Sequence, residues 1–166
     1  RFGRHLDPRL IARKLWSDRY SAAAAPEYLD THGRPTELAD LSDHDCILNF
    51  AEQWGRESSW PVLDGGTVAV RGRFVSGEVP LRLNAALQGL GIALLPEPIT
   101  RHYCATGQLE LVLAEHVGAV WTANLVFLER EFLPPQVRAF IDHTVAFYRD
   151  GMPFNPQVMP KLIERR

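Results

Sequence analysis

The chain has 166 residues, of which 46% are hydrophobic and 23% are charged, and its formal net charge is −2. These values are ordinary for a globular protein and exclude a disordered chain, a collagen and a coiled coil. The slightly negative charge disfavours DNA binding by this chain alone, because a duplex-binding domain carries a basic surface.

The first 50 residues are expected to contain three short strands. Residues 10–15 and residues 20–25 each predict a strand, although alanine, which dominates the second, is a weak strand former. The apolar residues 46–50 predict a buried strand.

Two short helices are expected between these strands. The first is predicted over residues 26–32, because Pro26 suits a first-turn position and Gly33 suits the position that ends a helix. The second is expected to be capped by Thr36 and to run to Leu41.

The middle of the chain is expected to be less regular. The polar residues 51–60 predict a loop, and residues 64–66 predict a turn. Residues 67–75 alternate in part and predict a strand, which ends at Ser76-Gly77-Glu78 before a helix that starts at Pro80.

Two glycines mark the connection from that helix to the next strand. Gly89 suits the left-handed conformation that ends a helix, and Gly91 allows a tight turn. Residues 92–95 are apolar on both faces, which is typical of a strand in a parallel sheet covered by helices.

The last part of the chain continues the alternation of helices and strands. A helix is expected from Pro98 to Gly107, and strands are expected over 109–113 and 123–128. Residues 134–149 predict a helix with one apolar face, formed by Val137, Phe140, Ile141, Val145 and Tyr148. The whole pattern indicates an α/β fold.

No motif supports an enzyme, a metal site or a cofactor. The six histidines are isolated, which is typical of surface or satisfied core residues, and the chain lacks HExxH, GxSxG, Walker and GxGxxG motifs. Cys46 lies in an apolar segment and is expected to be a buried, inert thiol, whereas Cys104 is expected to be more accessible. A pair of cysteines without CxxC spacing favours a reducing cytoplasm, with a single disulfide as the alternative.

The remaining signal is ligand binding. In open α/β sheets a ligand lies at the carboxyl ends of strands, where a helix N-terminus attracts anions. Arg4 is the candidate for pairing with an anion, with simple exposure as the alternative, and Glu78 either contacts a ligand or caps its own helix. The ligand-binding candidates are Arg4, Asn49, Phe50, Ser76, Gly77, Glu78 and Asn124.

Several stretches, in this order, resemble segments of the LysR-type transcriptional regulators. The first are RFGR (1–4) and LIARKL (10–15), followed by APEYL (25–29), HG (32–33), LADL (38–41) and HDC (44–46). The most recognisable are VRGR (70–73) and AALQGLGIALLP (85–96), and the last are LPP (133–135) and VRAFID (137–142). Each stretch is short, but their order and spacing over about residues 1–150 are specific.

The resemblance implies a two-lobed, periplasmic-binding-protein-like (type 2) effector domain. The first lobe would comprise residues 1–15 and 123–150, the second residues 16–122, and residues 151–166 would form a C-terminal tail. A small-molecule effector, anionic if Arg4 binds it, would lie between the lobes and alter the geometry of the oligomer and of bound DNA. The upstream part of the first lobe and the winged helix-turn-helix are expected to be missing from this chain.

The resemblance also implies partners and a location. Such domains assemble as homodimers or homotetramers in the cytoplasm, contact DNA only through the winged helix-turn-helix, and have no catalytic activity, metal or membrane partner. Directly after the candidate residues Ser76-Gly77-Glu78, Val79-Pro80-Leu81 replaces the more usual acidic and small residues at the start of the helix. The alternative function is a solute-binding protein of similar fold that serves a transporter.

Overall fold

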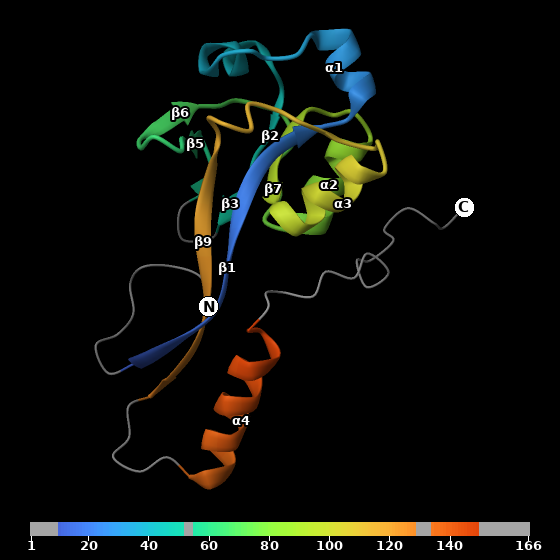
Figure 1. Cartoon of the computed structure of the whole chain (residues 1–166). Coiled ribbons are helices and arrows are strands. Elements are labelled where there is room, and N and C mark those ends of the chain that lie inside the picture. The colour runs from blue at the N-terminus through green and yellow to red at the C-terminus, as the bar shows by residue number, and fades with distance from the viewer. Residues whose placement is uncertain (1–9, 52–54, 129–133, 150–166) are drawn as a thin grey trace. The chain divides into compact units, whose positions relative to one another are not determined.

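The structure is a computed structural model that describes residues 10–51, 55–128 and 134–149 (Figure 1). Contacts divide the chain into two units. Of the described residues, unit 1 contains 10–18 and those from Val120 to Arg149, and unit 2 contains those within Arg19–Ala119. Arg4 and the expected tail at 151–166 lie outside the described residues.

One mixed sheet organises the chain. Its strands follow the order β2 (Cys46–Ile47), β7 (Ile92–Pro96), β1 (Leu10–Ala24) and β8 (Glu110–Leu111), and β9 (Gly118–Leu128) also pairs with β1. β2 and β7 are parallel, whereas β1 is antiparallel to both β7 and β8. The prediction of a parallel sheet is therefore correct for β2 and β7 but wrong for the rest of the sheet, because β1 is antiparallel to its neighbours.

β1 is a single strand of 15 residues rather than the two short strands that the sequence predicts. Its second half pairs with β7, with Ala22 opposite Leu94 and Ala23 opposite Ala93. Ala22, Ala23 and Ala24 are fully buried. Pairing on both edges therefore overrides the weak strand propensity of alanine.

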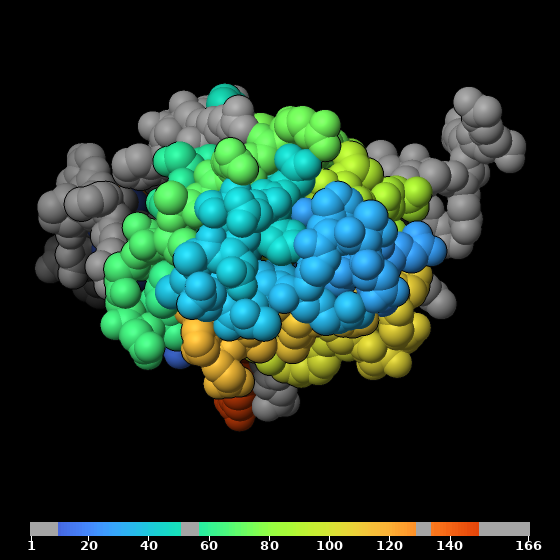
Figure 2. Space-filling view, turned by 90° about the horizontal axis from the view of Figure 1, so that it is seen from above, coloured from blue at the N-terminus to red at the C-terminus, as the bar shows by residue number. Residues whose placement is uncertain are grey.

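Unit 2 carries four short helical elements: α1 (Pro26–His32), the 3-10 helix η1 (Leu38–Asp43), α2 (Val79–Leu87) and α3 (Glu97–Ala105). Helices α2 and α3 both pack against β7, and Figure 1 shows them side by side. Figure 2 shows unit 2 from the face on which α1, in blue, lies beside the cyan segment that contains η1.

Most of the glycines predicted to end helices do so in the structure. Gly33 ends α1 with φ +88°, and Gly89 follows α2 with φ +70°. The cap of η1 differs from the prediction: Glu37, not Thr36, is the N-cap, and its capping box is closed by Asp40. Thr36 instead donates to the Asp40 carboxylate through its backbone N–H, at 2.8 Å.

The polar segment expected to be a loop contains short strands. β3 (Phe50–Ala51) pairs with β4 (Gly55–Arg56), and β5 (Ser59–Pro61) pairs with β6 (Thr67–Ala69). Trp60 in β5 is fully buried, which gives this hairpin a hydrophobic anchor. The loop prediction missed these strands because their pairing is set by contacts distant in sequence.

The strand predicted over residues 67–75 ends at Ala69 as β6. Beyond it, Gly72 lies against the backbone of β2, where an added Cβ would come within 1.8 Å of the Cys46 carbonyl oxygen. The backbone N–H of Cys46 donates to the Arg71 carbonyl at 2.8 Å. The chain beyond Ala69 therefore packs against β2 instead of continuing β6.

Unit 1 contains the first part of β1, most of β9, and α4 (Pro135–Phe147). β9 begins at Gly118, five residues before the predicted strand. Trp16 stacks on Tyr148 with ring centroids 4.7 Å apart and meets Trp121 edge-on at 5.9 Å. On α4, Ile141 is buried, whereas Phe140 is 62% exposed, so the predicted apolar face is only partly covered.

The hydrophobic core of unit 2 lies between the sheet and its helices. Its members include Leu29 of α1, Leu41 of η1, Leu48 and Ile92. Among the described residues, no helix is long and apolar enough to cross a membrane.

Candidate functional site

Five of the seven predicted ligand-binding residues meet where the chain leaves β2. Leu48 forms a parallel bridge with Val75, and the Ser76 N–H donates to the Leu48 carbonyl at 3.0 Å. This bridge places Asn49 and Phe50 beside Ser76, Gly77 and Glu78. A Cβ added to Gly77 would lie 2.7 Å from the Phe50 carbonyl oxygen, so the two segments touch at this point.

Exposure differs among these five residues. Phe50 is 48% exposed, although it is a large apolar side chain. Gly77 and Glu78 are exposed, and Asn49 and Ser76 are partly buried. An exposed phenylalanine beside polar groups is suited to contact a ligand that has both apolar and polar parts.

Glu78 is the N-cap residue of α2, but its side chain makes no capping hydrogen bond. The capping role that the sequence left open for Glu78 is therefore wrong. A capping side chain bonds the N–H of the second or third helical residue, and Pro80 in the second position has no N–H. The Glu78 backbone N–H instead donates to the Ser76 hydroxyl at 3.1 Å.

Glu57 is a functional candidate that the sequence analysis missed. One oxygen of its carboxylate, Oε2, accepts hydrogen bonds from the Asn49 N–H at 3.0 Å and from the Trp60 indole N–H at 3.1 Å. The Glu57 N–H donates back to the Asn49 carbonyl at 3.0 Å. No local motif distinguishes Glu57, because its role comes from a turn that returns the chain to Asn49.

These residues form what we call the β2-exit cluster, which comprises Asn49, Phe50, Glu57, Ser76, Gly77 and Glu78. Its two charged side chains are both carboxylates. A nearby cation, Arg82 in α2, is only 5% exposed and donates to the Leu94 carbonyl at 3.1 Å. Burial lowers the pKa of Arg82. The cluster itself therefore offers hydrogen-bond acceptors rather than an exposed positive charge.

The other two predicted residues are Arg4 and Asn124. Arg4 lies outside the described residues. Asn124 lies in β9 in unit 1, where its side-chain amide donates to the Thr122 carbonyl at 3.4 Å. Their contact with a ligand stays a prediction.

Neither cysteine has the surroundings of a catalytic thiol. Cys46 is 1% exposed, and burial raises its pKa to about 12, as expected for an inert thiol. Burial also raises the pKa of the partly buried Cys104, and both cysteines are free. Within the described part of the chain, no group of three or more His, Cys, Asp or Glu side chains is arranged to hold a metal ion.

Comparison with known families decides which family this fold represents. The family model described as the LysR substrate binding domain matches residues 1–149. The chain belongs to the LysR family. This LysR domain has the mixed α/β, periplasmic-binding-protein-like fold of the family's regulatory domains, and the predicted transporter alternative is not favoured.

Curated relatives and solved structures agree with this assignment. The HTH-type transcriptional regulator CrgA of Neisseria meningitidis is 32% identical over 142 residues, which are 84% of this LysR domain and 47% of CrgA. The regulatory domain of AphB in Vibrio vulnificus superposes with a TM-score of 0.72 and 32% identity, covering 89% of this chain and 73% of that one. The full-length Vibrio cholerae virulence activator AphB superposes with a TM-score of 0.75 and 29% identity, covering 89% and 51%. The chain thus spans about half the length of the full-length regulators that it matches.

Proposed function

We propose that this chain is the ligand-sensing regulatory domain of a LysR-type DNA-binding transcription factor. The observation that carries the proposal is the family match over residues 1–149, together with relatives that are HTH-type transcriptional regulators. The domain binds a small-molecule effector. Binding changes the arrangement of the two lobes and thereby the geometry of the oligomer and of bound DNA. A typical coupling between two such sites is about 1–3 kcal/mol.

Unit 2 contributes the β2-exit cluster to effector binding. The exposed Phe50 covers an apolar part of the effector, and the Ser76 hydroxyl and the Glu57 carboxylate accept hydrogen bonds from its polar groups. Arg4 and Asn124 supply the contribution of the first lobe, with Arg4 pairing with an acidic group. The first lobe comprises residues 1–15 and 123–150, and the second comprises residues 16–122.

The remaining properties follow from this role. The domain assembles as a homodimer or homotetramer in the cytoplasm and contacts DNA only through a winged helix-turn-helix of the whole protein. It catalyses no reaction and needs no cofactor.

A thermal-shift screen tests the sensing function. The protein is heated with a panel of small carboxylates, amino acids and aromatic acids. A ligand at about 100 times its Kd should stabilise the folded state by about 2.7 kcal/mol, which raises the melting temperature measurably. A panel without any stabilising compound would contradict the proposed sensing of metabolites of these classes.

Variants then locate the effector. Phe50→Ala should weaken the binding of a compound found in the screen by about tenfold, which corresponds to about 1.4 kcal/mol. Leu63→Ala is the matched control, because Leu63 is also an exposed apolar residue of unit 2 but lies outside the β2-exit cluster. Equal affinities of the two variants for the compound would contradict the assignment of the cluster.

A further inference from the structure

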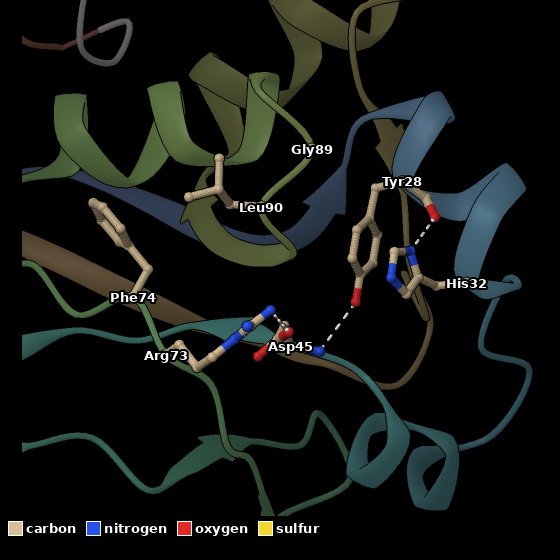
Figure 3. Close-up of a pocket in the computed structure, with 7 residues that line it drawn as sticks. All are labelled: Tyr28, His32, Asp45, Arg73, Phe74, Gly89 and Leu90. Atoms are coloured by element: carbon tan, nitrogen blue, oxygen red, sulfur yellow. Dashed lines mark hydrogen bonds and ion pairs between the residues drawn. The ribbon is translucent and has the colours of Figure 1, made fainter.

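A pocket lies in unit 2 at the end of β2 opposite the β2-exit cluster. Its volume is about 480 Å³, within the range of small-molecule sites. Figure 3 shows its lining residues: Tyr28, His32, Asp45, Arg73, Phe74, Gly89 and Leu90. Asp45 precedes β2, and Leu90 precedes β7, so we call it the amino-end pocket. Asp45 and Asn49 are four positions apart in the sequence, which corresponds to about 13 Å along an extended chain.

One wall of this pocket is aromatic and held in place. The rings of Tyr28 and His32 stack with centroids 4.3 Å apart and an interplanar angle of 18°. The Tyr28 hydroxyl accepts a hydrogen bond from the Asp45 N–H at 3.0 Å and lies 3.2 Å from Nδ1 of His44. The His32 Nδ1 donates to the Tyr28 carbonyl at 3.0 Å.

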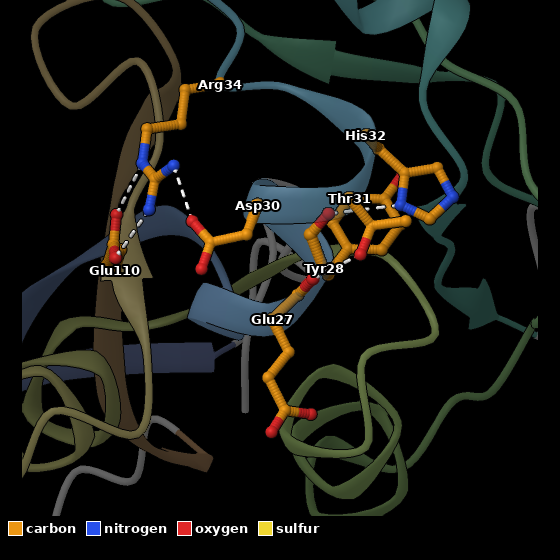
Figure 4. Close-up of polar contacts among 7 residues, drawn as sticks. All are labelled: Glu27, Tyr28, Asp30, Thr31, His32, Arg34 and Glu110. Carbon is orange, nitrogen blue, oxygen red and sulfur yellow. Dashed lines mark hydrogen bonds and ion pairs between the residues drawn. The ribbon is translucent and has the colours of Figure 1, made fainter.

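The helix that carries this wall is itself anchored. Arg34, just after α1, donates two hydrogen bonds of 2.9 Å to the Glu110 carboxylate of β8 and pairs with Asp30 at 2.9 Å (Figure 4). These bonds tie the C-terminal end of α1 to the edge of the sheet. The aromatic wall is therefore formed before any ligand arrives, which lowers the cost of binding.

The other side of the pocket is apolar. Leu90 is 47% exposed, although leucine is usually buried, and Phe74 is partly buried. Figure 3 shows Phe74 and Leu90 on the side opposite Tyr28 and His32, with the charged residues below them. An apolar side chain of a ligand would fit between these two sides.

An ion pair completes the lining. Arg73 Nη2 lies 2.8 Å from Asp45 Oδ2, and the side chains of Arg73 and Asp45 are 90% and 33% exposed. Exposed ion pairs of this kind contribute little to folding stability. Asp45 uses one N–H of the guanidinium, and the planar group carries five, so its other edge can receive a carboxylate with two hydrogen bonds.

The neutral ion pair selects the charge of a ligand. A ligand with a single negative charge is attracted by Arg73 and repelled by Asp45 at a similar distance, and the two interactions largely cancel. A zwitterion is attracted by both partners when its negative group faces Arg73 and its positive group faces Asp45. The ammonium and carboxylate of an α-amino acid are attached to one carbon and lie about 3 Å apart, which matches the spacing of the pair.

We propose that the amino-end pocket binds a free α-amino acid with an aromatic or large aliphatic side chain. Its carboxylate pairs with Arg73, its ammonium pairs with Asp45, and its side chain lies between Tyr28 and Leu90. The site is separate from the β2-exit cluster and does not depend on the function proposed for that cluster.

Isothermal titration calorimetry of the full chain tests this with three matched ligands. They are L-phenylalanine, 3-phenylpropionate, which lacks the ammonium, and phenethylamine, which lacks the carboxylate. We expect L-phenylalanine to bind and each singly charged analogue to bind at least about tenfold more weakly. Equal affinities of L-phenylalanine and 3-phenylpropionate would overturn the zwitterion proposal, and so would no binding of L-phenylalanine, L-tyrosine or L-leucine at millimolar concentration.

Two variants and two controls locate the binding. Arg73→Gln and Asp45→Asn should each weaken L-phenylalanine binding at least about tenfold. Arg71→Gln and Asp43→Asn remove the same charges from exposed neighbours that do not line the pocket, and should leave the affinity unchanged. Circular dichroism melting confirms that all four variants fold.

Two further outcomes separate this site from its alternatives. If Phe50→Ala abolishes L-phenylalanine binding and Arg73→Gln does not, the amino acid binds at the β2-exit cluster, and the amino-end pocket proposal is wrong. If Leu90→Asp lowers the sedimentation coefficient of the ligand-free chain, a second copy covers the pocket, which also overturns the proposal. The two proposals can fail separately. If no effector binds at the β2-exit cluster, L-phenylalanine should still bind at the amino-end pocket.

Discussion

Single residues fix the close approach of segments in unit 2. Gly91 has φ +151°, and a Cβ added there would lie 2.1 Å from the Asp45 carbonyl oxygen. A backbone oxygen held in place by the Ile92 N–H, at 3.0 Å, cannot easily move away. Gly89, two residues earlier, also has positive φ, but its nearest contact is Tyr28 Cβ at 3.9 Å.

These contacts predict different effects for two similar substitutions. Gly91→Ala should lower the free energy of unfolding by about 2–5 kcal/mol, because conformational strain and overlap with Asp45 add. Gly89→Ala should lower it by about 1 kcal/mol, since only the strain remains. Urea denaturation of both variants measures the difference, and equal losses would show that the Asp45 contact is relieved.

His44 predicts a pH dependence of stability. It is 6% exposed, lies 3.2 Å from the Tyr28 hydroxyl, and has a pKa lowered below 6.5, mainly by burial. The unfolded chain therefore takes up a proton at His44 more readily than the folded chain. The stabilising effect of the neutral ring is complete above about pH 6.5 and is lost as the pH falls toward the lower, folded-state pKa.

Urea denaturation between pH 7.5 and pH 5.5 tests this prediction. The free energy of unfolding should decrease as the pH is lowered, and His44→Gln should reduce the slope of this dependence. The control is His116→Gln, which replaces an exposed histidine and should not reduce the slope. Hydrogen bonds lower the pKa values of Asp40 and Glu110 below 3.8 and 4.5, so these carboxylates do not titrate in this range. An unchanged slope in His44→Gln would contradict the prediction.

Among the contacts between secondary-structure elements, a hydrogen bond from Arg82 links α2 to β7. Its guanidinium is buried and donates to the Leu94 carbonyl at 3.1 Å. Because α2 follows Glu78, this contact also positions one part of the β2-exit cluster. No local pattern predicts this contact, since an arginine on a short helix normally faces solvent.

Arg82→Ala should therefore destabilise the fold by about 2–4 kcal/mol, because it removes a hydrogen bond made by a charged group and leaves a cavity. Arg101→Ala on α3 is the control, since the Arg101 side chain is 73% exposed and pairs with Glu97 on its own helix. Thermal denaturation of the two variants measures the effect. A similar loss in both would mean that Arg82 does not anchor α2.

For the whole molecule, the net charge of −2 predicts that the 166-residue chain does not bind DNA by itself. Fluorescence anisotropy with a labelled duplex at 50 mM and 200 mM salt should show no binding at either concentration. Binding that weakens steeply with salt would reveal a basic surface and contradict the prediction. A complete relative with its helix-turn-helix is the positive control.

The sequence by itself determined the fold class, the family and the positions of most helices. Those features depend on local signals, such as Pro26, Gly33 and Gly89 at helix ends, or on the order of short motifs along the chain. Five predicted site residues also meet in the structure, because Asn49 and Phe50 follow a strand that is bridged to the segment before Ser76.

The tertiary structure alone decided the direction and length of β1, the strands within residues 51–60, the role of Glu57 and the amino-end pocket. Each of these depends on residues that are distant in sequence or on a turn with no local signature. Ala22 is paired with Leu94, Trp60 with Glu57, and Asp45 with Arg73. Strand pairing and side-chain contacts of this kind are selected by burial and by the complete set of neighbours, which local propensity does not contain.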